Sequence, residues 1–374
     1  MASQELGGPR PGETGQQGEF KISLPKELSR EELALKAGIV LTQYVERVLP
    51  ILHPMVISGG GKQELGAVPG RPEEQQLLID AVGQERLTNT IRENDCPARV
   101  LGEHNEISLS NGRESYVFFA QDPFDNTSQH KRDLPTSVFS VVSAYHKDGT
   151  PIGGVVIDIK AKKAYMNING KSTLVTYDLV EEDGEKTTEK KTGVKVVKKE
   201  EVARSQRKTL DDPNATMASF LGEKEYFIPA SQNFSHLIAN GFQRKTMLYP
   251  EGGAFVYGLL AAGKIDAYAM FKEPRTEIDP GFAVAKLAGC IIVSVDPETG
   301  TYEDYVFDPS QNKDDVAFFI AAATPEIRDE IIKYYMQAKQ ETQRREMEQR
   351  LKDSFIQSNQ TAFDIFVSGN QSAA

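Results

Sequence analysis

Residues 116–127 of this 374-residue chain read YVFFAQDPFDNT. The first part, through Ala120, is rich in aromatic and β-branched residues, and it predicts a buried strand that ends in a tight turn at an Asp-Pro step. Two carboxylates, Asp122 and Asp125, follow three positions apart, and the Thr127 hydroxyl comes two residues later. Oxygen ligands this close together suit a hard divalent cation such as Mg2+, which also binds water and phosphate oxygens. The same residues also form turns without a metal, so both interpretations stand at this point.

The composition is that of an ordinary globular protein, with 39% apolar and 26% charged residues. The length suits one large or two modest domains. A net charge of −11 argues against nucleic acid as a partner, and an anionic substrate would need local neutralisation by metal ions or backbone dipoles. No stretch has the apolar length of a membrane-spanning helix, and residues 1–25 predict a disordered leader without the features of a signal peptide. We therefore expect a cytoplasmic protein with no membrane partner.

The N-terminal half, residues 26–175, combines helices with strands. A capping box at Ser29 predicts a helix that runs to Pro50. A glycine-rich loop over 58–70 and a second helix over about 72–94 follow. β-rich runs at 138–145 and 154–159 flank a hairpin signal, Asp148-Gly149. Residues 176–215 are polar and rich in lysine, which favours a solvated hairpin or flexible insertion over a basic flap above an anionic substrate.

The C-terminal half, residues 216–335, alternates helices and strands. A small apolar helix is expected to open at Gly252-Gly253, and a strand follows over 265–271. Another helix is expected to open at Asp279-Pro280, before a strand over 290–295. Thr324-Pro325 predicts the start of a long final helix, because proline suits the first helical position. Its polar part, 336–374, is expected to project into solvent or meet a partner chain. The class is mixed α and β.

Acidic residues occur at the ends of several predicted elements, in an order and spacing that resemble a known superfamily. This is the inositol monophosphatase-like phosphatases, which also include fructose-1,6-bisphosphatases and bisphosphate nucleotidases. The resemblance runs from about residue 34 to residue 334 and rests on Gly102-Glu103-His104, the 122–127 motif, Gly263-Lys264-Ile265-Asp266-Ala267-Tyr268, and Ile278-Asp279-Pro280-Gly281.

The resemblance implies an α+β protein with a layered αβαβα sandwich and the activity of a metal-dependent phosphomonoesterase. It implies two or three Mg2+ ions, which polarise the phosphoryl group and activate a water for in-line attack. The metal ligands that it carries over are Glu103, Asp122, Asp125, the Phe124 carbonyl, and Asp279 as the ligand that bridges to the second ion. It also implies that Thr127, together with Glu103, orients the attacking water.

The substrate side of the site departs more from the family pattern. Backbone N–H groups of Asn126 and Thr127 are expected to hold phosphate oxygens, although Asn126 stands where relatives have glycine. Gly252 and Gly253 lie roughly where the family has an Arg-Ser-x-Gly-Ser step that lines the alcohol side of the pocket. Two cations near Asp279 could contact a second phosphate, but surface charge is the commoner role of such residues; they are Lys272 and Arg275.

The expected substrate is a small phosphorylated metabolite. Inositol monophosphate ranks first, ahead of fructose-1,6-bisphosphate and 3′-phosphoadenosine 5′-phosphate, and the resemblance implies inhibition by Li+ and a possible homodimer. His104 replaces the second glutamate of the family's Gly-Glu-Glu step, which puts a third metal site in doubt. The alternative is a weakly active or non-catalytic relative that binds metal or phosphate and acts through its long C-terminal helix.

Overall fold

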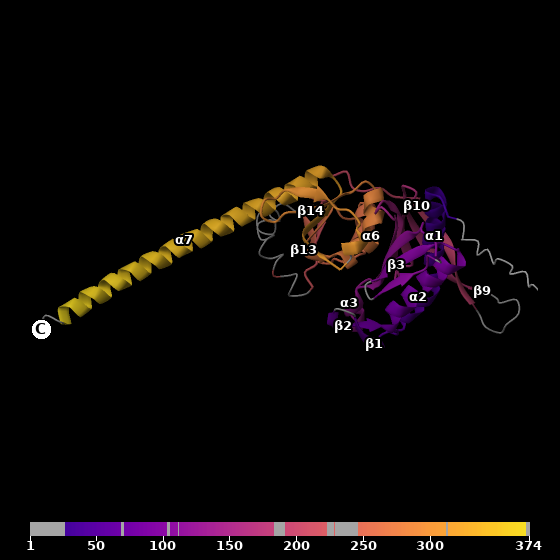
Figure 1. Ribbon diagram of the computed structural model, residues 1–374, viewed down its shortest axis with the longest axis horizontal. Helices are drawn as coiled ribbons and strands as arrows, with labels where there is room; N and C mark the ends of the chain where they lie inside the picture. The colour runs from indigo at the N-terminus through magenta and orange to yellow at the C-terminus, as the bar shows by residue number, and fades with distance from the viewer. Residues whose placement is uncertain are drawn as a thin grey trace, which may run out of the picture.

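A computed structural model describes most of the chain, namely residues 27–68, 71–102, 105–110, 112–182, 191–222, 228, 246–311 and 313–371. The predicted leader and Glu103-His104 lie outside the described residues. Figure 1 shows a layered body from which one long helix, α7 (Pro325–Gln371), projects at the C-terminal end.

The first layer consists of α1 (Arg30–Ile57) and α2 (Leu78–Glu93). The predicted capping box at Ser29 is confirmed, but α1 continues through Pro50 to Ile57. Its buried face continues as well, with Leu52 and Val56 in the core, and this packing outweighs the cost of an interior proline. The second helix starts later than predicted, because 71–77 form a strand. This strand, β2 (Arg71–Leu77), pairs antiparallel with β1 (Glu64–Val68), which lies in the segment predicted as a loop.

The second layer is a sheet of eight strands in the order β10-β9-β8-β7-β6-β5-β3-β4. Its central strand, β5, is buried at all nine positions, which confirms the predicted buried strand, and it runs parallel to β3 and antiparallel to β6. At one edge β9 and β10 form a long antiparallel hairpin, so the lysine-rich segment predicted over 176–215 forms a hairpin in its described residues up to Glu201. The strands are β3 (Ala98–Gly102), β4 (Glu106–Ser108), β5 (Val117–Asp125), β6 (Phe139–His146), β7 (Pro151–Asp158), β8 (Lys163–Ile168), β9 (Lys171–Glu182) and β10 (Lys191–Glu201).

The third and fourth layers are a helix pair and a second sheet. Helices α5 (Val256–Ala261) and α6 (Arg275–Leu287) pack against the first sheet on one side and the second sheet on the other. The second sheet has six strands in the order β12-β11-β13-β16-β14-β15. These are β11 (Thr216–Ala218), β12 (Met247–Tyr249), β13 (Ala267–Pro274), β14 (Ile291–Val295), β15 (Tyr302–Asp304) and β16 (Asp315–Ala322).

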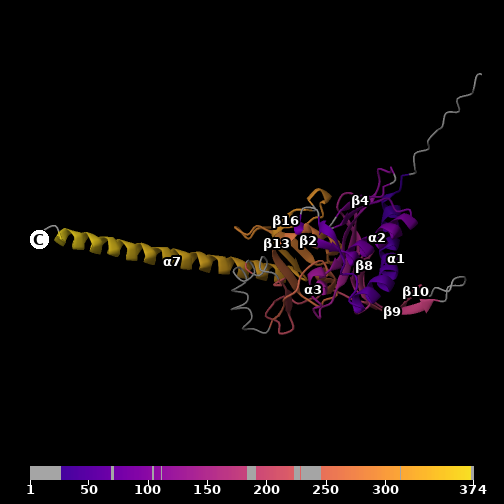
Figure 2. The ribbon, with the colours of Figure 1, turned by 90° about the horizontal axis from the view of Figure 1, so that it is seen from below.

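The fifth layer is the start of α7, which begins after Thr324 as predicted. Ile327, Ile331 and Tyr335 pack on the outer face of the second sheet, whereas Met347 and Leu351 further along are exposed. Two views at right angles show α7 extending away from the body (Figures 1 and 2). No helix in the described ranges is both long and apolar enough to span a bilayer. The helix and sheet layers confirm the predicted α+β class and the αβαβα sandwich.

Candidate metal centre

The carboxyl end of β5 places two buried carboxylates side by side. Asp122 and Asp125 are 4% and 6% exposed. Residues three apart in a regular strand face opposite ways, but the pairing of β5 with β6 shifts register between these two aspartates. The backbone N–H of Phe124 donates to Oδ1 of Asp122 over 3.1 Å. The irregular strand end therefore lets both side chains face one site.

Asn126 ends the strand in a left-handed conformation, with φ 72°. Asparagine tolerates this backbone better than most residues, which confirms that the turn survives without the family's glycine. Its side-chain amide donates to the Ser137 carbonyl over 3.0 Å, and Thr127 opens the short helix α3 (Thr127–Lys131). The Thr127 hydroxyl donates over 2.5 Å to the carbonyl of Phe124, one of the predicted metal ligands.

The second half of the chain reaches the same site through Gly252-Gly253. Gly253 has φ +118°, and a Cβ on it would lie 2.7 Å from Oδ1 of Asp125. The Phe255 backbone N–H, two residues on, donates to Oδ2 of Asp125 over 2.8 Å. Gly253, predicted to contact substrate, thus packs directly against a predicted metal ligand, whereas Gly252 packs against Tyr268 and Phe220.

Among the described residues a third carboxylate joins the group, and it is Glu277 rather than the predicted Asp279. Oxygens of Asp122, Asp125 and Glu277 all lie within 4.8 Å of one another. The reason is the helix register. Helix α6 begins at Arg275, five residues before the proline that was expected to open it, so Glu277 is in its first turn. Side chains two residues apart on a helix point about 200° apart, so Glu277 and Asp279 face different surroundings.

Asp279 lies inside the protein, 2% exposed. Its Oδ1 accepts a hydrogen bond from the Tyr305 hydroxyl over 2.6 Å, and its carbonyl accepts one from the Tyr145 hydroxyl. Burial raises the pKa of Asp279 to about 7, against the opposing effects of the Tyr305 hydrogen bond and the Arg275 charge. These contacts tie α6 to the strands on both sides of it.

The two predicted phosphate-binding cations are placed differently from each other. Arg275 donates to the Tyr305 hydroxyl and to the Val306 carbonyl, each over 3.1 Å, and its guanidinium lies 4.8 Å from the centre of the Tyr305 ring. Lys272 is exposed and has φ 55°. Arg275 is therefore engaged within the protein, while Lys272 is at the surface.

Glu103, a predicted ligand and catalytic residue, lies outside the described residues. The residue before it, Gly102, ends β3 and pairs with Gln121 of β5, directly before Asp122.

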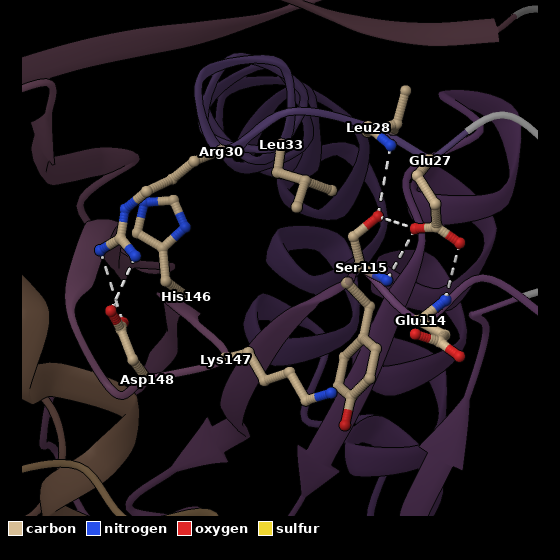
Figure 3. A pocket seen from close by; sticks show the side chains of 10 residues that line it. Glu27, Leu28, Arg30, Leu33, Glu114, Ser115, His146, Lys147 and Asp148 are labelled. Atoms are coloured by element: carbon tan, nitrogen blue, oxygen red, sulfur yellow. Dashed lines mark hydrogen bonds and ion pairs between the residues drawn. The ribbon is translucent and has the colours of Figure 1, made fainter.

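A cavity of about 510 Å³ lies at the other end of β5 (Figure 3). Tyr116, which lines it, precedes β5, and the nine residues from Val117 to Asp125 span about 26 Å. Charged groups around this cavity already pair: Arg30 with Asp148, and the Glu27 carboxylate with the N–H groups of Glu114 and Ser115. It is thus separate from the acidic group.

Comparisons with known proteins give fold similarity without sequence matches. No protein-family model matches the chain, and no curated protein does. Among solved structures, SuhB from Bartonella henselae matches with 14% identity and a TM-score of 0.53, covering 79% of this chain and 96% of that one. The IMPase of Thermotoga maritima matches with 15% identity and a TM-score of 0.50, at 79% and 96% coverage. SaIMPase-II with inositol monophosphate bound matches with 14% identity and a TM-score of 0.51, at 83% and 98% coverage.

The chain has the inositol monophosphatase fold. At these identities the likeness is one of fold, and it agrees with the resemblance inferred from the motifs. The resemblance carried the bridging ligand over to Asp279, two residues after the acid that joins the group, because Glu277 lies in the first turn of α6. A signal for Glu277 was present in the sequence: acidic residues favour the first turn of a helix, and Pro274 precedes that turn.

Proposed function

We propose that the chain is a metal-dependent phosphomonoesterase that hydrolyses a small sugar- or polyol-phosphate. One observation carries the proposal: three carboxylates, from Asp122, Asp125 and Glu277, converge within 4.8 Å in the inositol monophosphatase fold. An all-oxygen ligand set of this kind suits Mg2+. Two or three ions are proposed, with Glu103 and the Phe124 carbonyl as further ligands.

The charges of the group support a bound cation. Asp122 and Asp125 are almost fully buried, and like charges at this spacing repel each other when both groups are ionised. A divalent cation would remove that repulsion, and the N–H donors of Phe124 and Phe255 also stabilise the two carboxylates. The donor set therefore fits a hard metal ion.

The chain's own residues have distinct proposed roles. Bound Mg2+ would polarise a phosphoryl group and lower the pKa of a bound water. Thr127 holds the Phe124 carbonyl in place through its hydroxyl, and with Glu103 it is proposed to orient the attacking water. Asn126 and the Gly252-Gly253 turn border Asp125 and are proposed to contact the substrate.

Monophosphates rank ahead of bisphosphates as substrates. SaIMPase-II, which shares the fold, has inositol monophosphate bound in its structure. Arg275, one of two cations considered for a second phosphate, already donates hydrogen bonds to Tyr305 and Val306. We therefore propose inositol monophosphate or a related polyol phosphate as the substrate, and Li+ as an inhibitor.

Phosphate release from a panel of sugar, polyol and nucleotide phosphates, with Mg2+ and with EDTA, tests the proposal. We expect release that requires Mg2+. Outer partners of metal ligands typically contribute about 10–100-fold, so loss of a ligand itself in Asp122→Asn should reduce kcat/KM at least about 100-fold. Glu303→Gln, an exposed acid on β15, is the matched control. Release that persists in EDTA, or in Asp122→Asn, would contradict the metal-dependent mechanism.

A further inference from the structure

A second buried acid lies near the metal centre, outside the group of ligands. Glu273, near the end of β13, is 2% exposed. Along β13, Ala267, Ala269 and Phe271 face the core shared with α7, whereas Tyr268 and Met270 face α5 and α6. Regular alternation would place Glu273 with the first set. Instead its carboxylate meets the Tyr268 hydroxyl, five residues away and on the other face.

Lys272 lies at this reversal, which the paired strand β16 shares: Val316, opposite Glu273, lies in the inner core, whereas Phe318 lies in the core shared with α7. The Lys272 φ of 55° is left-handed, which is uncommon for a residue with a side chain and costs of order 1–3 kcal/mol. This left-handed residue directly precedes Glu273, whose carboxylate lies on the inner face. Backbone strain beside a buried acid points to a use for that acid.

Glu273 is linked to Asp125 by a continuous chain of contacts. The Tyr268 hydroxyl donates to Oε1 of Glu273 over 2.7 Å and accepts from the Gly253 N–H over 3.4 Å. A Cβ on Gly252 would lie 2.6 Å from the same hydroxyl, so Tyr268 supports both glycines. On its other side Gly253 packs against Oδ1 of Asp125.

The burial of Glu273 is unfavourable in itself. Desolvation raises the pKa of Glu273 to about 8, and the charges of Asp125 and Asp315 raise it further, against the hydrogen bond from Tyr268. A well-packed apolar residue is often at least as stabilising as a buried charged group. The position therefore makes better sense as support for the site than as support for the fold.

We propose that Glu273 is a positioning residue of the metal centre, which acts through Tyr268 to hold the Gly252-Gly253 turn against Asp125. The inference rests on the proposed function, because it assumes that Asp125 binds metal. Its effect is on metal affinity, since the turn fixes where the Asp125 carboxylate lies.

Titration calorimetry with Mg2+ on the full-length chain, stripped of metal with EDTA, tests the inference without any substrate. Partners of metal ligands typically contribute about 10–100-fold in affinity. We expect the Kd for Mg2+ to rise about tenfold or more in Tyr268→Phe and in Glu273→Leu. Glu273→Gln keeps a hydrogen-bond acceptor, so it should recover most of the affinity lost in Glu273→Leu. The double variant Tyr268→Phe/Glu273→Leu should be no weaker than the worse single variant, because both act through one chain of contacts.

Tyr257→Phe is the matched control. Tyr257 is a buried tyrosine in the same core as Tyr268, and its hydroxyl has no hydrogen-bond partner among the described residues. Loss of the Tyr257 hydroxyl should leave the Kd for Mg2+ unchanged, and circular dichroism should show that each variant is folded. If Glu273→Leu does not fold, Tyr268→Phe decides alone.

Four results would overturn the inference. Wild-type affinity in Tyr268→Phe would break the chain of contacts at its centre. Equal loss in Glu273→Gln and Glu273→Leu would show that the hydrogen-bond acceptor at this position does not hold the turn. Failure of the wild-type chain to bind Mg2+ would remove the proposed function and this inference together, whereas Mg2+ binding that no variant weakens would remove the inference alone.

Discussion

The Phe255 backbone N–H donates a 2.8 Å hydrogen bond to Oδ2 of Asp125, across 130 residues of sequence. Asp125 ends β5 in the first sheet, and Phe255 directly precedes α5, which packs between the sheets. The candidate metal centre is thus also a junction between the two halves of the chain. Any group that binds there is coupled to the stability of the whole fold.

Mg2+ should therefore stabilise the protein against heat. A ligand at 100 times its Kd adds about 2.7 kcal/mol to the free energy of unfolding, which for a chain of this size is a rise in Tm of a few degrees. Scanning calorimetry with Mg2+ and with EDTA measures the difference. The rise should vanish in Asp125→Asn, because an amide is a poor ligand for a hard cation. An equal rise in that variant would show that Mg2+ binds elsewhere.

Glu277 and Asp279 should differ in what their loss affects. Glu277→Gln should reduce Mg2+-dependent phosphate release at least about 100-fold, as expected for a direct ligand. Asp279→Ala should instead lower the free energy of unfolding by about 1–3 kcal/mol, because it leaves the buried Tyr305 hydroxyl without its acceptor. Urea unfolding and phosphate release, measured on both variants, separate the two effects. A larger loss of activity in Asp279→Ala than in Glu277→Gln would restore Asp279 as the ligand.

Stability in EDTA should fall as pH rises from about 4.5 to 8. Burial raises the pKa of Glu273 from 4.5 to about 8 and that of Asp279 from 3.8 to about 7. Within this window the folded state holds protons that the unfolded state has released, so each group removes up to about 1.4 kcal/mol per pH unit. Urea unfolding at pH 5 and pH 8 should show a smaller difference for Glu273→Gln than for the wild type. If the stability difference between pH 5 and pH 8 is the same in Glu273→Gln as in the wild type, Glu273 is not the group that holds the proton.

The sequence was sufficient where the determining residues are neighbours in the chain. The β5 motif combines a β-forming run with an Asp-Pro turn, and Asn126 tolerates its left-handed backbone, so Asp122 and Asp125 could be placed without a structure. The hairpin strand β2 was missed, since its residues have little β-propensity and only its pairing with β1 reveals it.

Errors in the site came from register, which local patterns define poorly. Pro280 suggested the start of a helix, yet α6 begins at Arg275. Because the helix starts earlier than predicted, the acid that lies near Asp122 is Glu277 and not Asp279. The contact of Glu273 with Tyr268 could not be predicted from the sequence for a related reason. It depends on a reversal of the strand alternation at the left-handed Lys272, and lysine carries no signal for that conformation.

Gly253→Ala should weaken both the fold and the metal centre. Its φ of +118° disfavours any side chain, and the new Cβ would lie 2.7 Å from Oδ1 of Asp125. We expect a loss of about 1–3 kcal/mol in the free energy of unfolding from the backbone alone, and a rise in the Kd for Mg2+ from the displaced carboxylate. Gly170→Ala is the matched control, because Gly170 also has a positive φ, +74°, but nothing within 4 Å of its Cβ position. It should lose stability in urea unfolding while keeping wild-type Mg2+ affinity by calorimetry. If both variants bind Mg2+ equally well, the Gly253 contact does not determine where Asp125 lies.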